Sequence, residues 1–313
     1  MNKQSCTKKT SIGGQAVIEG VMMRGPRKTS VVVRKKDGTL ERDLSDTYKE
    51  GKIPWYTKVP FVRGIFNLGS SLYIGYKALN FSASFFVDEE EEEPGRFEKW
   101  LSEKLGDRLN DALMTFSMVL GVGLSVVLFF MLPTLITGLI QQWLPNHVVK
   151  ALTEGLVRIL IFLGYLAGVS LMEDIRRVYM YHGAEHKTIA CYEAGEELTV
   201  ENVRKYTRFH PRCGTSFLLI VMVVSILVFS FLSWNNVWIR LLLRILLIPV
   251  VVGISYEIIK LAGRYDNPVT RAVSRPGLWL QRLTTREPED SMIEVAIAAM
   301  KDVIPEQEGE DRW

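Results

Sequence analysis

Cysteine is scarce in this sequence, with only Cys6, Cys191 and Cys213 among 313 residues. An odd, sparse set of this kind argues against a fold held together by disulfides. The net charge of +3 is too small to indicate a nucleic-acid-binding protein, although it suits a protein at an anionic membrane surface. The sequence also lacks a G-x-S-x-G elbow, a P-loop and a Rossmann fingerprint, so no motif supports a serine nucleophile or nucleotide hydrolysis.

Long uncharged stretches dominate the second half of the chain. No acidic residue, lysine or arginine occurs from Ala112 to Val149, and about 20 apolar residues suffice to span a bilayer. We predict four membrane spans, at Leu113–Ile140, Leu152–Met172, Gly214–Ser233 and Trp238–Ile259. The alternative for each is a buried core helix, and it is stronger for the second and fourth spans, which contain arginine. Arg158, Arg240 and Arg244 are expected near the ends of those spans, where their side chains can reach the headgroups.

The positively charged residues are distributed unequally about these spans. Of the 38 lysines and arginines, 19 precede the first span, 7 lie in Glu173–Arg212 and 8 follow from Glu257 onwards. Basic residues mark the cytoplasmic side. We therefore predict a multi-pass protein of the cell membrane, in bacteria the inner membrane, with both termini and the Glu173–Arg212 loop in the cytoplasm. Met1–Thr10 is polar and no short apolar run follows it, so a signal peptide is not expected.

The predicted fold class is mostly α, a polytopic membrane bundle with a small N-terminal β-containing module and a C-terminal amphipathic helix. The module should contain a hairpin of Thr29–Arg34 and Thr39–Leu44, since Asp37-Gly38 suits a type I′ turn. The predicted segments are a glycine-rich cytoplasmic module (1–60), an interfacial or re-entrant helix (61–87), an acidic linker with a short helix (88–111), two membrane helices (112–172), the histidine-containing loop (173–213), two more membrane helices (214–260) and a cytoplasmic tail (261–313).

Two of these segments leave alternatives open. Phe61–Phe86 carries Arg63, Asn67 and Lys77 among apolar residues, and it could instead be a fifth span that would upset the predicted orientation. Asp88–Glu93 is an unbroken acidic run, typical of a solvated linker, with cation binding as the alternative.

One helix stop and two helix starts are predicted after the second span. The helix of that span should continue through Cys191 and stop at Ala194-Gly195, and Thr199 should cap the start of a short helix. In the tail, Ser291-Met-Ile-Glu294 has the spacing of a capping box. One apolar face follows it at helical spacing, made of Met292, Val295, Ala296, Ala299, Met300 and Val303.

Three of only four histidines lie close together, in His182-Gly-Ala-Glu-His186 and His210-Pro-Arg-Cys213. The H-x-x-E-H order inverts the zincin motif, and positions i and i+4 share one helix face. We predict that His182 and His186 bind a divalent metal, zinc first, with His210 as third ligand and Cys213 as the next candidate. All four ligands together would make a closed, structural site. The alternative is that these histidines make ordinary hydrogen bonds. The geometry also depends on a helix that tolerates Gly183.

Several acidic residues are candidates for a role at such a site. Glu185 could deprotonate a metal-activated water, or it could orient a histidine from outside the ligand set. Glu19 lies in the glycine-rich stretch Gln15–Gly25, where close approach of another group or a tight turn are equally good interpretations. Glu257 lies at the cytoplasmic end of the fourth span and could serve the site or form an ion pair. A cysteine–histidine nucleophile pair is a further alternative.

Four sequence blocks resemble the bacterial YqhQ family: Gly13–Gly25, Tyr181–Thr188, His210–Phe217 and Pro276–Pro288. The likeness covers nearly the whole chain, and the blocks occur in the same order. The resemblance implies a multi-pass membrane protein of a family with unknown function, described as predicted metal-dependent enzymes. It implies no substrate.

We therefore expect a membrane-embedded metal-dependent enzyme, a hydrolase, whose site lies at the cytoplasmic face. The competing expectation is a membrane scaffold, regulator or transporter in which the histidine cluster is structural or holds no metal. The lipid bilayer is the expected partner and nucleic acid is not. The substrate and any homo-oligomer stay open.

Overall fold

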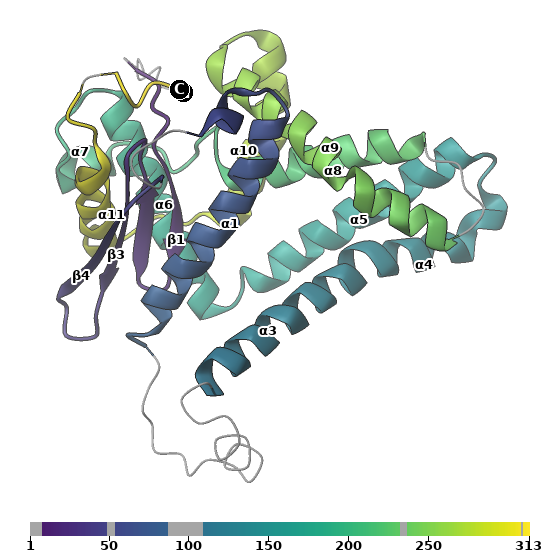
Figure 1. The fold of residues 1–313 in the computed structure, drawn as a ribbon, viewed down its shortest axis with the longest axis horizontal. Coiled ribbons are helices and arrows are strands. Elements are labelled where there is room, and N and C mark those ends of the chain that lie inside the picture. The colour runs from purple at the N-terminus through teal and green to yellow at the C-terminus, as the bar shows by residue number, and fades with distance from the viewer. Residues whose placement is uncertain (1–7, 49–53, 87–108, 232–236, 308) are drawn as a thin grey trace. The chain divides into compact units, whose positions relative to one another are not determined.

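The computed structural model describes residues 8–48, 54–86, 109–231, 237–307 and 309–313. The chain is mostly helical, with one small antiparallel sheet near its N-terminus (Figure 1). It divides into two compact units, one made of Met1–Phe86 and Leu166–Trp313, the other of Val87–Tyr165. The acidic run Asp88–Glu93 lies outside the described residues.

The sheet has four strands in chain order: β1 (Gly13–Val17), β2 (Gly20–Arg24), β3 (Lys28–Arg34) and β4 (Leu40–Asp46). The predicted hairpin is confirmed as β3 and β4, but its predicted type I′ turn is wrong. The Lys35 amide donates to the Thr39 carbonyl, and Gly38 alone in the loop has a positive φ, of 85°. These features fit a three-residue loop, because a type I turn followed by one left-handed residue needs glycine only at that last position.

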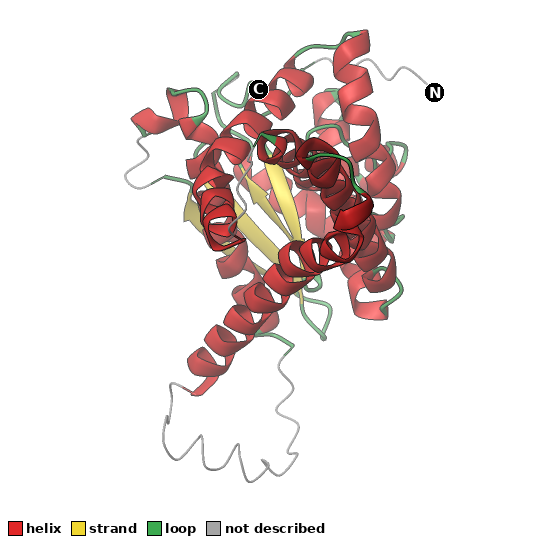
Figure 2. Ribbon diagram, turned by 90° about the vertical axis from the view of Figure 1, so that its right-hand side faces the viewer, coloured by secondary structure: helices red, strands yellow, loops and turns green. Residues whose placement is uncertain are grey.

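The two faces of the sheet pack against different helices (Figure 2). Val21, Met23 and Val32 point to a core shared with α6 (Glu173–Glu193) and α11 (Asp290–Val303). Their neighbours along the strands point to the opposite face, because side chains alternate in a strand. That opposite face is covered by α1 (Val62–Ala83) and consists of Val17, Met22, Val31 and Val33, packed on Ala78.

The predicted apolar face of the C-terminal helix is confirmed, since all six of its predicted members are buried in α11. The predicted capping box is wrong. The helix begins at Asp290, one residue before Ser291, and Glu289 occupies the N-cap without a side-chain hydrogen bond.

The helix that carries the histidines is separate from the preceding apolar helix. α5 (His147–Val169) ends before a turn, and α6 starts anew at Glu173 with Met172 as its N-cap, so the predicted continuous helix through Cys191 is wrong. The predicted helix end at Ala194-Gly195 is confirmed for α6, because Gly195 follows the helix with a φ of 75°. Thr199 caps the short helix α7 (Val200–Arg204) by accepting from the Asn202 amide.

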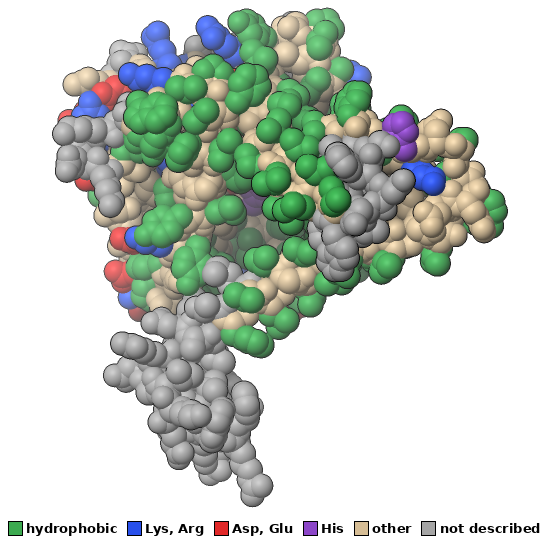
Figure 3. All heavy atoms as spheres, turned by 45° about the vertical axis from the view of Figure 1, so that its right-hand side comes forward, with side chains coloured by type: hydrophobic (Ala, Val, Ile, Leu, Met, Phe, Trp, Pro, Cys, Tyr) green, Lys and Arg blue, Asp and Glu red, His purple; other side chains and the backbone are tan. Residues whose placement is uncertain are grey.

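Three helices are long and apolar enough to cross a membrane: Val119–Trp143, His147–Val169 and Leu242–Arg264. A shorter apolar helix, α8 (Gly214–Ser230), packs on α9 (Val237–Arg264), which contains the last of these. Most of the coloured side chains on the face drawn in Figure 3 are hydrophobic. Among the described residues, α1 is not one of the membrane-crossing candidates, and it packs on the sheet and on α9.

In the second unit, α3 (Leu109–Val126) runs through one π-helical turn, Val127–Met131, into α4 (Leu132–Ile140). The expectation that Arg158 reaches the end of its helix is wrong. Arg158 is 6% exposed in the middle of α5, beside Glu154 at 3.3 Å, and its Nε donates to the Phe129 carbonyl at 2.9 Å. That carbonyl is available because the π turn and Pro133 interrupt the regular helical hydrogen bonds.

One further helix leads from the apolar pair back to the histidines. α10 (Pro268–Thr284) starts with a capping box in which Asn267 and Thr270 bond each other's backbone amides. Its last residue, Thr284, is buried against α6.

Candidate metal centre

The centre is built on α6, which is helical throughout the H-x-x-E-H motif. His182 and His186 therefore lie on adjacent turns, with ring centroids 4.4 Å apart. Gly183 stands between them although glycine weakens a helix by about 1 kcal/mol. A Cβ at Gly183 would collide with the Arg286 carbonyl oxygen, so glycine is required for the segment after α10 to pack on α6.

Cys213 completes a group of three ligand atoms. His182, His186 and Cys213 each offer one atom, and the three atoms lie within 4.8 Å of one another. Two of these atoms, His182 Nε2 and Cys213 Sγ, are 3.2 Å apart. Cys213 is the N-cap residue of α8, so the group joins α6, which packs on the sheet, to the start of an apolar helix. Three protein ligands leave one position of a tetrahedral ion free.

Both histidines are oriented by backbone carbonyls. His182 Nδ1 lies 2.9 Å from the Thr284 carbonyl oxygen, and His186 Nδ1 lies 2.6 Å from that of Arg208. A carbonyl oxygen only accepts, so each Nδ1 carries the proton and donates it. Nε2 of each ring is thereby the atom left to bind a metal, the arrangement that metal-ligating histidines usually have.

The protonation states of this group favour a thiolate. Burial alone raises the pKa of Cys213, but the imidazoles of His182 and His186 outweigh it and hold that pKa well below its usual 9. Burial likewise opposes the charged form of His182, yet the Cys213 thiolate and then Glu185 raise the pKa of His182 to about 9. The thiolate is the form of cysteine that binds metal ions.

Glu185 lies beside the three ligands with one oxygen unsatisfied. Its side chain is buried, and among the described residues its Oε2 has no hydrogen-bond partner. Burial raises the pKa of Glu185, an effect that the charges of His182 and His186 and the Gly14 amide reduce. A buried, unpaired carboxylate oxygen is costly and points to a water or ligand that would satisfy it.

The predicted third ligand, His210, lies close by but faces other groups. Its ring centroid is 5.5 Å from that of His186, while its Nε2 is 3.3 Å from an Arg212 nitrogen and 3.7 Å from Glu193 Oε2. His210 is therefore outside the three-residue group, and Cys213, the second choice from the sequence, is the residue that the structure places beside the other two histidines.

The comparisons with known proteins agree on one family. The family described as "Protein of unknown function (DUF1385)" matches residues 59–306. The chain is also 36% identical over 294 residues to "Uncharacterized protein YqhQ" of Bacillus subtilis (strain 168), covering 93% of this chain and 92% of that protein. The chain belongs to this family. No solved structure matches it.

Glu19, a candidate from the glycine-rich stretch, holds the sheet to α6. It sits in the β1–β2 turn with a φ of 49°, and its carboxylate accepts two hydrogen bonds from Arg177 at 2.6 Å and one from Tyr181 at 3.2 Å. The nearby Gly14 is the residue that approaches the centre, because a Cβ there would lie 3.0 Å from the Glu185 carboxyl carbon. Glu19 thus positions the glycine-rich segment Gly13–Gly25 over α6 from outside the ligand group.

Glu257 joins α1 to α9. Its Oε1 accepts from Arg63 Nε at 2.8 Å and from the Phe61 amide at 3.0 Å, so the ion-pair interpretation applies. Gly64 and Gly253 allow the two helices to touch here, since side chains at either would press on Tyr256 or Phe61. Glu257 has no contact with the three ligands among the interactions of the described residues.

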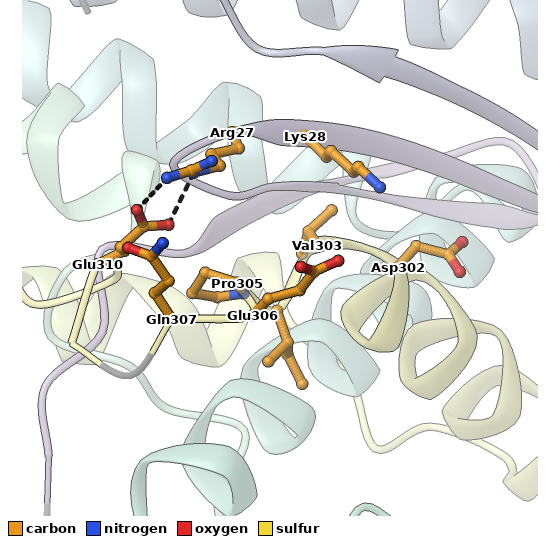
Figure 4. A pocket seen from close by; sticks show the side chains of 9 residues that line it. Arg27, Lys28, Asp302, Val303, Pro305, Glu306, Gln307 and Glu310 are labelled. Atoms are coloured by element: carbon orange, nitrogen blue, oxygen red, sulfur yellow. Dashed lines mark hydrogen bonds and ion pairs between the residues drawn. The ribbon is translucent and has the colours of Figure 1, made fainter. Parts of the chain in front are cut away.

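Sequence reasoning missed Thr284, Arg286 and Gln281, which all lie in the fourth block that the family resemblance singled out. Gln281 bonds the backbone of His210 in both directions, at 2.8 Å and 2.7 Å. Thr284 Oγ1 and Arg286 Nε are buried and, like Glu185 Oε2, lack a partner among the described residues. A separate small pocket between the β2–β3 turn and the end of α11 is lined by Arg27 and Glu310, and it contains none of these residues (Figure 4).

Proposed function

We propose that this protein is a membrane-embedded metal-dependent hydrolase. His182 Nε2, His186 Nε2 and the Cys213 thiolate would hold one divalent ion, zinc first. The observation that carries the proposal is the pair of bonds from Nδ1 to the carbonyls of Thr284 and Arg208, because it directs both Nε2 atoms to the side where Cys213 lies. Buried histidines that only make hydrogen bonds would not need both Nε2 atoms to point towards the same cysteine.

The surroundings of the ligands suit hydrolysis. A divalent ion here would polarise a substrate carbonyl or phosphoryl oxygen and acidify a water molecule. Glu185 would take a proton from the attacking water through Oε2, and it would return that proton to the leaving group as the bond to the reacting atom breaks. His182 is the partly exposed member of the group, so substrate would approach past its ring.

The membrane part of the proposal comprises four spans, with α8 added to the three longer candidates. Both termini and the α6–α7 segment would lie in the cytoplasm, because 34 of the 38 lysines and arginines then face that side. Cysteine labelling of intact cells tests this arrangement. A reagent that cannot cross the membrane should modify a cysteine placed at Asn146 and leave one placed at Lys301 unmodified. Labelling of Lys301→Cys in intact cells would show that the orientation is the opposite of the one proposed.

Elemental analysis of detergent-purified protein tests the metal site. We expect about one zinc per chain, lost in His182→Ala, His186→Ala and Cys213→Ser. The chain supplies matched controls in His147, which lies outside the cluster, and in its other buried cysteine, so His147→Ala and Cys191→Ser should keep the metal. Wild-type protein with only traces of metal, or equal metal in all five variants, would overturn the proposal.

One specific observation favours a second candidate, a thiol hydrolase. The 3.2 Å contact between His182 and Cys213, with a thiolate favoured, is also the geometry of a cysteine nucleophile beside its base. His186→Ala separates the two functions. It removes a metal ligand but leaves the His182–Cys213 pair in place, so hydrolysis of a nitrophenyl ester that survives this change and is blocked by iodoacetamide would favour the thiol mechanism.

A further inference from the structure

α10 presents three distinct sides. Gly277, Gln281 and Thr284 form its buried side. A second side is apolar and exposed, with Val269 71%, Val273 38% and Trp279 54% accessible. A third side carries basic residues at helical spacing, namely Arg271, Arg275 and Arg282, all exposed. Exposed apolar side chains flanked by arginines on one helix are typical of a helix that lies in a membrane surface.

The arginines of this helix are available to bind anions. Arg271 has an exposed partner in Asp266 at 3.4 Å, a contact of little energetic weight. Arg275 and Arg282 have no ion-pair partner among the described residues. They lie seven residues apart and hence along one stripe of the helix. Phosphate groups of lipids complement such a stripe in charge and geometry.

The same helix is tied to both the apolar helices and the metal ligands. Gly277 lets α10 pack directly on Ser216 of α8, where a Cβ would collide with the serine side chain. Gln281 donates to Ser216 Oγ at 3.1 Å and bonds the His210 backbone. The final carbonyl of the helix, on Thr284, accepts from His182. The depth of α10 therefore fixes the depth of the three ligands.

We propose that α10 lies in the headgroup layer of an anionic bilayer and holds the catalytic group there, so that the substrate is the phosphate-bearing headgroup of a lipid. This inference rests on the proposed function and adds its substrate class. The apolar side of α10 would face the acyl chains, the arginine stripe would bind phosphates, and the partly exposed His182 would meet the headgroup. Glu185 Oε2 and Thr284 Oγ1, both buried and without a described partner, are the atoms that such a ligand or its water would satisfy.

The depth of α10 can be measured without any metal. A spin label would be attached to Val273→Cys in full-length protein in lipid nanodiscs, with Cys6→Ser as background because Cys191 and Cys213 are buried. We expect the label to collide more often with oxygen, which concentrates in acyl chains, than with a water-soluble nickel complex. Lys301→Cys on the exposed side of α11 is the matched control and should show the opposite preference. Equal, nickel-dominated collisions at both positions would overturn the proposal.

The place of the ligands relative to lipid phosphate is tested by loading the purified protein with cobalt(II). In nanodiscs of phosphatidylcholine and phosphatidylglycerol, bound cobalt should broaden the phosphorus-31 signal of phosphatidylglycerol, and soluble inorganic phosphate at equal concentration should be affected less. Full cobalt loading with no broadening of any lipid phosphorus would overturn this inference alone. Failure of cobalt to bind would instead contradict the proposed metal site, so the two failures are distinguishable.

The arginine stripe has its own test. Arg275→Gln with Arg282→Gln should lower the phosphatidylglycerol retained after purification in mild detergent by about fivefold for each arginine removed. Lys28→Gln with Lys301→Gln changes the charge equally at two exposed positions elsewhere and should retain the wild-type amount. Equal losses in both double variants would show only a general effect of charge and would overturn the assignment of the stripe.

Discussion

His182 Nε2 lies 3.2 Å from Cys213 Sγ, although the two residues are 31 positions apart in the chain. His182 comes from the middle of α6, and Cys213 is the residue that starts the apolar helix α8. Gln281 helps to bring these segments together, because it holds the His210 backbone three residues before Cys213. The contact thus joins a helix packed on the sheet to a helix that we propose to be in the membrane.

Glu185→Gln should separate catalysis from metal binding. The amide keeps the size of the side chain but cannot take a proton, so hydrolysis of a nitrophenyl phosphodiester should fall by about a hundredfold or more. Metal content should stay at the wild-type level, because Glu185 lies outside the ligand group. The measurements are the initial rate and elemental analysis on the same preparation. Unchanged hydrolysis would exclude Glu185 as the base, and lost metal would make it a ligand.

Gly183→Ala should destabilise the protein even though alanine favours a helix. The added methyl group would collide with the Arg286 carbonyl oxygen. Because this is a backbone atom, the collision is relieved only if the whole segment after α10 moves. Overpacking of this kind costs about 1 to 3 kcal/mol. The matched control is Gly69→Ala in α1, where the space is open and the same change should stabilise by up to about 1 kcal/mol. The measurement is the melting temperature of each variant in detergent, which should fall for Gly183→Ala and rise for Gly69→Ala.

The parts of the fold that follow from local pattern were predictable from the sequence. The apolar face of α11, the β3–β4 strands and the cap at Thr199 are confirmed because periodicity and capping act between near neighbours. Gly38 shows the limit of such reasoning. Its glycine correctly marks a turn, but the number of loop residues depends on how the two strands pair.

The candidate site was predictable only in part, for a different reason. The spacing of His182 and His186 places both on one face of α6, which a local rule can foresee. Choosing between His210 and Cys213 depends on tertiary structure, since Glu193 of α6 and Arg212 both face the His210 ring. The backbone carbonyls that orient the two histidines leave no mark on the side-chain sequence.

Glu193 should make stability depend on pH in the acidic range. Burial raises the pKa of Glu193, but the nearby His210 ring, the charge of Arg212 and the Thr10 amide outweigh it and lower that pKa to about 2. A lowered carboxyl pKa contributes stability that is complete above the ordinary value near 4.5 and is lost as pH falls towards 2. The contribution is about 3 kcal/mol at most.

The comparison that isolates this effect is melting temperature against pH for wild type and Glu193→Gln. Wild type should lose stability between about pH 4.5 and pH 2 more steeply than the variant. Glu294→Gln, which alters an exposed ion pair with Arg34, is the matched control and should follow wild type. Parallel curves for wild type and Glu193→Gln would contradict the assigned pKa.

In the second unit, Glu154 and Arg158 should stabilise the helical hairpin only as a pair. Both are buried, and Thr134 donates to Glu154 Oε1 at 2.9 Å. Glu154→Ala leaves the Arg158 charge without its carboxylate in an apolar setting and should cost about 3 to 5 kcal/mol. Glu154→Met with Arg158→Leu removes both charges at similar volume and should be close to neutral in the free energy of unfolding. Unfolding by titration with sodium dodecyl sulfate measures these variants together with Glu154→Met and Arg158→Leu, the two single variants that close the double-mutant cycle. A double variant as unstable as the sum of the single variants would show that the two residues act independently and would contradict their pairing.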